Sequence, residues 1–100
     1  TKDSRMEISS SSNNLTITGN IKSVSDFQSI KSSLDEMLKT SKNVNVNILD
    51  SLSMTSSVIG YFNKLILKDG VGISMSIGDA KLIELLRDLN LESLFKVRKA

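Results

Sequence analysis

The sequence contains neither cysteine nor histidine. The lack of cysteine excludes disulfides and thiolate catalysis, and the lack of histidine excludes imidazole bases. Without either residue type, the usual zinc, haem and iron–sulfur sites are also excluded. We therefore expect no metal and no cofactor.

Apolar runs long enough to cross a bilayer are also missing, and no segment resembles a signal peptide. We therefore expect a cytoplasmic protein without membrane insertion. The 100 residues contain no proline, no internal repeat and no long linker, so we expect a single domain over residues 1–100. Residues 1–5 carry no pattern, and we interpret them as a disordered leader or as added residues, with Met6 as a candidate native start.

Aromatic residues are few, and the positive charge is concentrated at the chain ends. The sequence has one tyrosine and three phenylalanines, and the phenylalanines fall on apolar patterns. The formal net charge is +2, but residues 6–95 hold eight basic and ten acidic side chains. The body of the chain thus offers neither a basic patch nor an aromatic stacking platform, and nucleic acid is not an expected partner.

Alternating apolar and polar residues predict the strands. Residues 6–8 and 15–17 form two short runs separated by a serine and asparagine turn over 9–14, which is the pattern of a hairpin. Residues 43–48 alternate asparagine with valine or isoleucine, and residues 71–77 alternate apolar residues with glycine or serine. These two runs predict half-buried strands further along the sheet.

Apolar residues at helical spacing predict the helices. The first helix is expected over about 26–39, with Ser25 and Gln28 at the spacing of a capping box. The second follows a polar turn at 52–57 and is expected to end near Lys68, before an aspartate–glycine turn.

The third helix is expected over 81–89, with Asp79 as its N-cap and Asn90 as a left-handed C-cap. A last short strand is expected within 94–97. This order predicts an α/β fold of two layers: a mixed sheet of four to five strands that opens with an antiparallel hairpin, and about three helices mainly on one face.

Residues with catalytic chemistry are not arranged in pairs. Asp35, Glu36 and Asp50 are carboxylates on predicted polar surfaces. Nothing in the sequence pairs them as a catalytic acid and base. The sequence contains no glycine-rich phosphate loop, and the Ser93 to Lys96 match to a Ser-x-x-Lys pattern lacks the other motifs of that enzyme class. We do not expect an enzyme.

The turn from Leu52 to Ser57 is the stretch where we expect function. It delivers hydroxyl side chains to the start of the second helix, where unpaired N–H groups and the positive dipole end favour an anion. A phosphoryl group on one of these hydroxyls would find donors there. The alternative, hydroxyls that only cap a helix, stays open because serine and threonine are common N-caps.

The segment Met54-Thr55-Ser56-Ser57-Val58-Ile59-Gly60 resembles the Asp-Ser-Ser-Gly-Leu-Gly region of STAS domains, the fold of bacterial anti-sigma factor antagonists. The exit from the third helix, Asn90-Leu91-Glu92-Ser93-Leu94-Phe95-Lys96-Val97, is similar to the closing Gly-Leu-x-x-Leu-Phe-x-Val pattern of that family. The order of elements agrees over nearly the whole chain. Thr55 and Val58 stand where the family has aspartate and glycine.

The resemblance implies a regulatory module that works by partner switching. Ser56 matches the serine that an anti-sigma factor of the GHKL-type serine kinase class phosphorylates in that family, with Thr55 and Ser57 as alternatives. The implied partners are this kinase and a cognate phosphatase. The expected partner-binding residues are Met54, Thr55, Ser56, Ser57, Val58 and Tyr61, together with Asn20, Ile21, Lys22 and Ser23 from the preceding loop.

A second function stays open beside this one. STAS domains that are not phosphorylated serve as scaffolds or subunits, as in stressosomes or lipid-transport ABC complexes, and the resemblance fits these as well. The predicted edge strand at 6–10 also offers a route to a weak homodimer.

Overall fold

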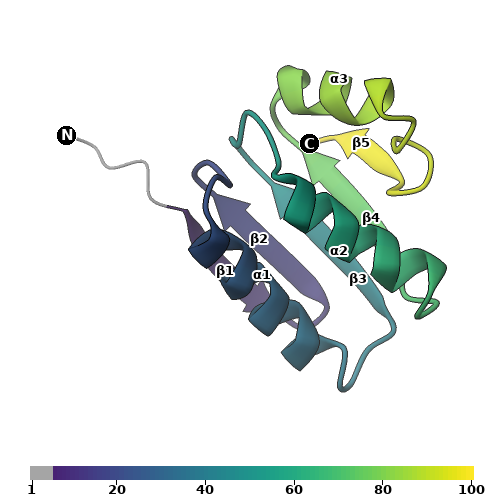
Figure 1. Ribbon diagram of the computed structural model, residues 1–100. Coiled ribbons are helices and arrows are strands. Elements are labelled where there is room, and N and C mark those ends of the chain that lie inside the picture. The colour runs from purple at the N-terminus through teal and green to yellow at the C-terminus, as the bar shows by residue number, and fades with distance from the viewer. Residues whose placement is uncertain (1–5) are drawn as a thin grey trace.

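The computed structural model describes residues 6–100, and the interpretation of residues 1–5 as a leader lies outside them (Figure 1). In chain order the elements are β1 (Glu7–Ser11), β2 (Asn14–Thr18), α1 (Val24–Met37), β3 (Asn43–Ile48), α2 (Ser56–Leu67), β4 (Gly72–Ile77), α3 (Ala80–Asp88) and β5 (Val97–Lys99).

The five strands form one mixed sheet in the order β1-β2-β3-β4-β5. β1 pairs with β2 as an antiparallel hairpin, and the pairs β2–β3, β3–β4 and β4–β5 are parallel. Each parallel pair is joined through a helix, because parallel neighbours need a crossover connection. The predicted α/β fold with a mixed sheet and an opening hairpin is confirmed.

One face of the sheet carries the core, and the other face is polar. In β3, Val44, Val46 and Ile48 are buried, whereas Asn45 and Asn47 between them are only half-buried. β4 repeats this alternation with serine in the half-buried positions. A strand covered by helices on both faces would be apolar throughout, so the asparagine and serine positions mark the uncovered face.

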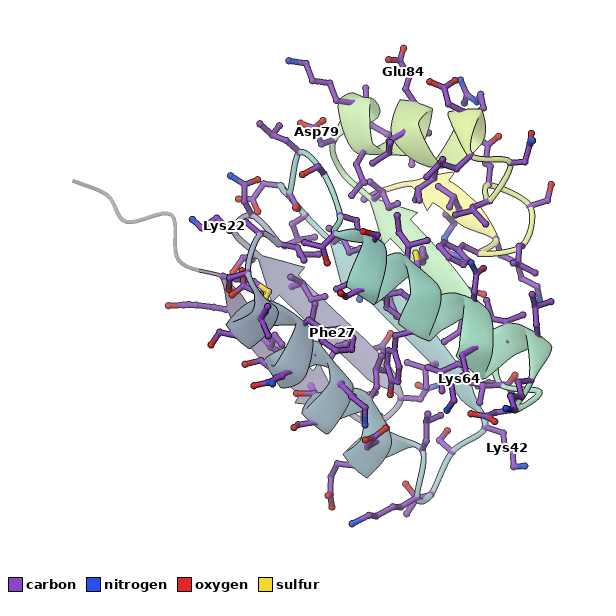
Figure 2. All side chains as sticks on the ribbon, in the orientation of Figure 1. Lys22, Phe27, Lys42, Lys64, Asp79 and Glu84 are labelled. Carbon is purple, nitrogen blue, oxygen red and sulfur yellow. The ribbon has the colours of Figure 1, made fainter. Side chains whose placement is uncertain are left out.

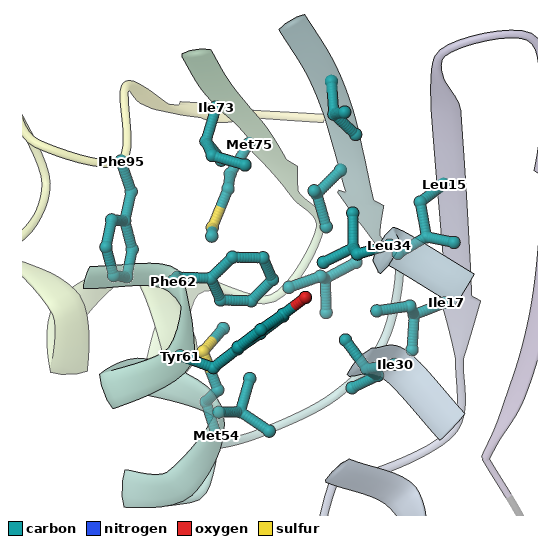
Figure 3. Close-up of a cluster of buried hydrophobic side chains, with 14 of the residues drawn as sticks. Leu15, Ile17, Ile30, Leu34, Met54, Tyr61, Phe62, Ile73, Met75 and Phe95 are labelled. Atoms are coloured by element: carbon teal, nitrogen blue, oxygen red, sulfur yellow. The ribbon is translucent and has the colours of Figure 1, made fainter. Parts of the chain in front are cut away.

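The core joins the covered face of the sheet to all three helices (Figure 3). Phe62 of α2 lies near its centre, with its ring 5.9 Å from that of Phe95. Ile30 and Leu34 bring α1 into the same cluster, and Leu82 and Leu86 bring in α3. A continuous apolar cluster of this kind supplies the main driving force for folding.

The first helix begins two residues earlier than predicted. Its capping box is formed by Ser23 and Asp26, not by Ser25 and Gln28. The Asp26 carboxylate accepts hydrogen bonds from the backbone N–H groups of both Lys22 and Ser23, at 2.9 and 3.1 Å. A charged acceptor that satisfies two backbone donors is a stronger signal than the glutamine that we favoured.

Two strand boundaries also differ from the prediction. The turn of the hairpin is only Ser12-Asn13, with Ser12 at φ 56°, so three of the serines assigned to the turn belong to β1. The last strand begins at Val97, after Lys96 at φ 51°, and buried Phe95 precedes it. The predicted caps Asp79 and Asn90 are confirmed: the Asp79 side chain accepts from the Lys81 N–H, and Asn90 has φ 62°.

Candidate functional site

The polar turn before α2 lies at the edge of the sheet where the parallel strands β2, β3 and β4 end (Figure 1). Three connections meet at this edge: residues 19–23 after β2, residues 49–55 after β3, and residues 78–79 after β4. The carboxyl ends of parallel strands are the usual position for binding sites in α/β proteins. Lys22 and Asp79 mark this edge, and Lys42 and Lys64 mark the opposite one (Figure 2).

Three side chains tie the first two of these connections together. The Asp50 carboxylate accepts from the Gly19 N–H at 2.7 Å, and the Asn20 amide oxygen accepts from the Leu52 N–H at 2.9 Å. Ser51 is fully buried, accepts from the Ile21 N–H at 3.0 Å and donates to the Ser53 carbonyl at 2.7 Å. The two loops therefore form one hydrogen-bonded unit that positions the start of α2.

α2 begins with the hydroxyl residues predicted for the site. Thr55 is the N-cap, and its hydroxyl accepts from the Val58 N–H at 3.3 Å. Ser56 and Ser57 occupy the first two helical positions and are exposed. At these positions the backbone N–H groups have no partner inside a helix, and the positive end of the helix dipole adds to their field.

A hollow of about 130 Å³ separates the start of α1 from the start of α2. Its lining combines predicted site residues with two apolar side chains of α1, namely Lys22, Ser23, Thr55 and Ser57 with Val24 and Phe27. The structure thus brings the two predicted segments side by side. Ser56 is outside this lining and is exposed beside it.

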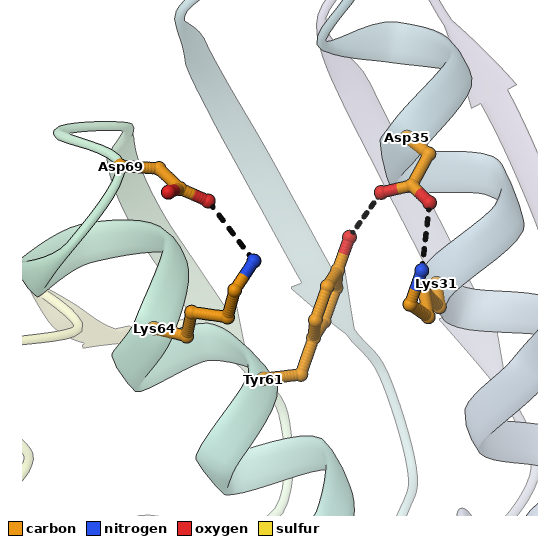
Figure 4. A network of polar contacts seen from close by, with 5 residues as sticks. All are labelled: Lys31, Asp35, Tyr61, Lys64 and Asp69. Atoms are coloured by element: carbon orange, nitrogen blue, oxygen red, sulfur yellow. Dashed lines mark hydrogen bonds and ion pairs between the residues drawn. The ribbon is translucent and has the colours of Figure 1, made fainter.

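Four of the predicted partner-binding residues have buried side chains. Ile21, Met54 and Val58 belong to the core cluster. Tyr61 is buried as well, and it points into the space between α1 and α2 (Figure 4). These four side chains therefore lie beneath the predicted partner-binding surface. Its exposed residues are Lys22, Ser23, Ser56 and Ser57, and Asn20 and Thr55 are half-exposed.

Sequence reasoning missed three exposed apolar side chains at or beside this edge. Val24 is 71% exposed, Leu52 is 50% exposed and Leu49 is 45% exposed. A signal for the last two was available, because Leu49 and Leu52 fall outside the strand alternation and sit in a polar loop. In the sequence Asp50 is an isolated carboxylate, but in the structure it anchors the neighbouring loop.

Tyr61 links α2 to α1 through a polar network (Figure 4). Its hydroxyl donates to the Asp35 carboxylate at 2.7 Å, and Lys31 binds the other oxygen of that carboxylate at 3.0 Å. Burial and the bond to Asp35 raise the pKa of Tyr61 well above its usual value. The hydrogen bond from Tyr61, followed by the bond from Lys31, lowers the pKa of Asp35.

Residues 6–100 contain neither a candidate metal cluster nor a candidate membrane-spanning helix. Over residues 6–100, histidine, cysteine, aspartate and glutamate do not gather into a group of three that could hold a metal ion. None of the helices in the same range has the length and apolar character needed to cross a membrane.

The chain matches no family model, and it has no significant match among curated proteins or solved structures.

Proposed function

We propose that this chain is a STAS-type regulatory module that acts as a bacterial, cytoplasmic anti-sigma factor antagonist. In this proposal the unphosphorylated domain captures an anti-sigma factor that is also a GHKL-type serine kinase. Phosphorylation of Ser56 breaks the complex, and a phosphatase restores binding. The chain itself is not an enzyme in this scheme.

The observation that carries the proposal is the position of Ser56. It is the first residue of α2, it is exposed, and it follows a loop that hydrogen bonds hold against its neighbour. The fold class also agrees with the resemblance, because a mixed sheet with an opening hairpin and helices on one face is what a STAS domain implies. Thr55 fulfils the capping role that the family aspartate would have.

The electrostatics explain how such a switch would work. A phosphoryl group adds about −1.5 to −2 charges at neutral pH. The helix start tolerates this charge, since its N–H groups and dipole favour an anion. A partner that has closed over Val24, Leu49 and Leu52 would have to desolvate the same charge, which is costly without a paired cation.

The second candidate is a STAS scaffold or subunit that is not phosphorylated. The same exposed apolar residues favour it, because they suit stable association as well as reversible capture. It predicts a complex that forms through the same edge and does not respond to charge at Ser56.

Mass spectrometry on the protein purified from its native cells tests the modification directly. We expect a species heavier by one phosphoryl group, with fragment mapping to Ser56, whose abundance changes between growth and stress. A phosphoryl group on Thr55 or Ser57 would keep the switch and move its site by one residue. Unmodified protein under every condition would contradict the phosphorylation model and favour the scaffold.

A pair of charge variants separates the two candidates. Ser56→Asp should abolish co-purification of a kinase-type partner, whereas Ser53→Asp should keep it, because Ser53 is exposed in the same turn but lies before the helix start. Both variants add one carboxylate, so net charge cancels in the comparison. Equal binding by both would exclude a charge switch at Ser56.

A further inference from the structure

A larger pocket lies at the opposite edge of the sheet from the turn. It has a volume of about 350 Å³ and opens between the C-terminal halves of α1 and α2, beside the loops that lead into β3 and β4. Its lining residues are Lys31, Asp35, Leu38, Lys39, Ser41, Lys42, Tyr61, Lys64, Leu65, Asp69 and Val71. This volume falls in the range of about 300–1,000 Å³ that is typical of small-molecule sites.

The pocket gathers positive charge from a chain body that is otherwise acidic. Residues 6–95 contain eight basic side chains against ten acidic ones, and four of those eight line this pocket. Only two carboxylates, Asp35 and Asp69, are in the lining. The local excess of cations is the reverse of the balance in the rest of the body, which favours an anionic ligand.

Both carboxylates in the lining are already engaged. Asp35 binds Lys31 and the Tyr61 hydroxyl, and Asp69 binds Lys64 at 3.3 Å (Figure 4). Lys42 has no ion-pair partner in the part of the chain that the structure describes. It is therefore the cation most available to an incoming anion.

The inner wall of the pocket is apolar. Leu65 and Val71 are buried, Leu38 is half-buried against the core, and the Tyr61 ring stands between the two helices. A bare inorganic ion would leave these surfaces without a contact, whereas an organic anion with a small ring or short chain would cover them.

We propose that this pocket binds a small organic anion, with its apolar part against Leu38, Leu65 and Val71 and its phosphate or carboxylate at Lys42. Lys39 and Lys64 stand on the same rim, and their ion pairs with Glu36 and Asp69 are exposed. Exposed pairs of this kind are weak, so both lysines can turn toward a ligand. The inference is independent of phosphorylation at Ser56.

Phenyl phosphate is a suitable probe because it combines one ring with one phosphate. In NMR spectra of protein labelled with the heavy nitrogen isotope, we expect added phenyl phosphate to cause saturable shifts of the backbone amide signals of residues 38–42 and 64–71. Inorganic phosphate, which lacks the ring, and phenol, which lacks the phosphate, should bind at least about tenfold more weakly. Equal binding of inorganic phosphate would overturn the apolar part of the proposal.

Two charge-reversal variants provide the control. Lys42→Glu should weaken phenyl phosphate binding about tenfold or more, whereas Lys81→Glu changes the net charge equally at the far edge and should leave it unchanged. Equal weakening by both variants would reduce the effect to net charge and overturn the site. So would co-sedimentation with phosphatidylglycerol vesicles in the absence of saturable phenyl phosphate binding, since it would identify a membrane surface as the ligand.

Discussion

Tyr61 combines two environments in one side chain. Its ring packs edge-to-face on Phe27, with the centroids 5.9 Å apart, while its hydroxyl reaches the half-exposed Asp35. Burial, followed by the hydrogen bond to the Asp35 carboxylate, raises the pKa of the phenol and favours its neutral form. The residue therefore connects α1 to α2 by an apolar contact and a hydrogen bond together.

The first prediction concerns this phenol. Its pKa in the folded state is raised above the ordinary 10.0, so its contribution to stability is complete below pH 10.0 and is lost as the pH rises through the folded-state value. Because it is the only tyrosine and the chain has no tryptophan, tyrosinate absorbance reports this residue alone. The midpoint should lie higher in the folded protein than in urea.

Two variants of α1 separate the causes of that shift. Asp35→Asn removes the adjacent charge and should lower the Tyr61 pKa toward 10.0, while burial keeps part of the elevation. Glu36→Gln removes the neighbouring carboxylate, which bonds to Lys39 instead, and should leave the midpoint in place. An unchanged midpoint in Asp35→Asn would show that the negative charge of Asp35 contributes nothing to the raised pKa.

How much of the candidate site could be predicted differs from residue to residue. A hydroxyl cap for α2 could be predicted from hydroxyl residues placed before an apolar helical pattern, since capping is a local property, and the structure assigns the cap to Thr55. The role of Ser51 did not follow, because its partner Ile21 lies 30 residues earlier in the chain. The burial of Tyr61 could not be predicted either, because it depends on contact with a neighbouring helix, which local spacing in the sequence does not reveal.

At the level of elements, two glycines near the candidate site have opposite roles. Gly78 follows β4, and a Cβ there would meet the backbone carbonyl of Leu49 in the neighbouring loop. Gly60 is an exposed residue within α2, and a Cβ there would meet nothing within 4 Å. One glycine is required for close approach of two loops, and the other only adds flexibility to the helix.

The second prediction follows from this difference. Gly78→Ala should lower the free energy of unfolding, because the clash involves backbone that cannot rotate away. Gly60→Ala should raise it by about 0.5–1 kcal/mol through helix propensity. Urea unfolding followed by far-ultraviolet circular dichroism measures both, and a Gly78→Ala protein as stable as the parent would contradict the tight packing of the loops.

Element types were predictable from the sequence because each has one dominant period. Alternation over residues 43–48 and 71–77 predicted β3 and β4 correctly, since one face of each strand is covered and the other is not. Boundaries were less predictable. The start of α1 depends on which capping box forms, Ser23 with Asp26 or Ser25 with Gln28. The first forms because the Asp26 carboxylate also accepts a hydrogen bond from a second backbone donor, the N–H of Lys22.

For the whole molecule, the sheet order places β3 at the centre, between β2 and β4, and makes β1 and β5 the two outermost strands. The three apolar side chains of β3 are all buried, whereas the three residues of β5 are exposed or half-buried. Stability should therefore decrease from the centre of the sheet outward.

Native-state hydrogen exchange measures this gradient. We expect the amides of β3 to exchange only through global unfolding, and those of β5 and the outer edge of β1 to exchange through local opening at much lower free energy. Exchange at increasing urea separates the two routes, because only global opening depends strongly on denaturant. Uniform protection over all five strands would contradict this prediction.

α2 begins at the hydroxyl turn and contributes Tyr61, Lys64 and Leu65 to the lysine-lined pocket, about 8–14 Å further along the helix axis than Ser56. The two surfaces are therefore separate enough to be occupied together, and a single rigid element joins them. If occupancy of one changes the affinity of the other by some factor, thermodynamic reciprocity requires the same factor in the opposite direction. The factor by which a pocket ligand changes the affinity of the turn for a protein would thus also be the factor by which that protein changes the affinity of the pocket for its ligand.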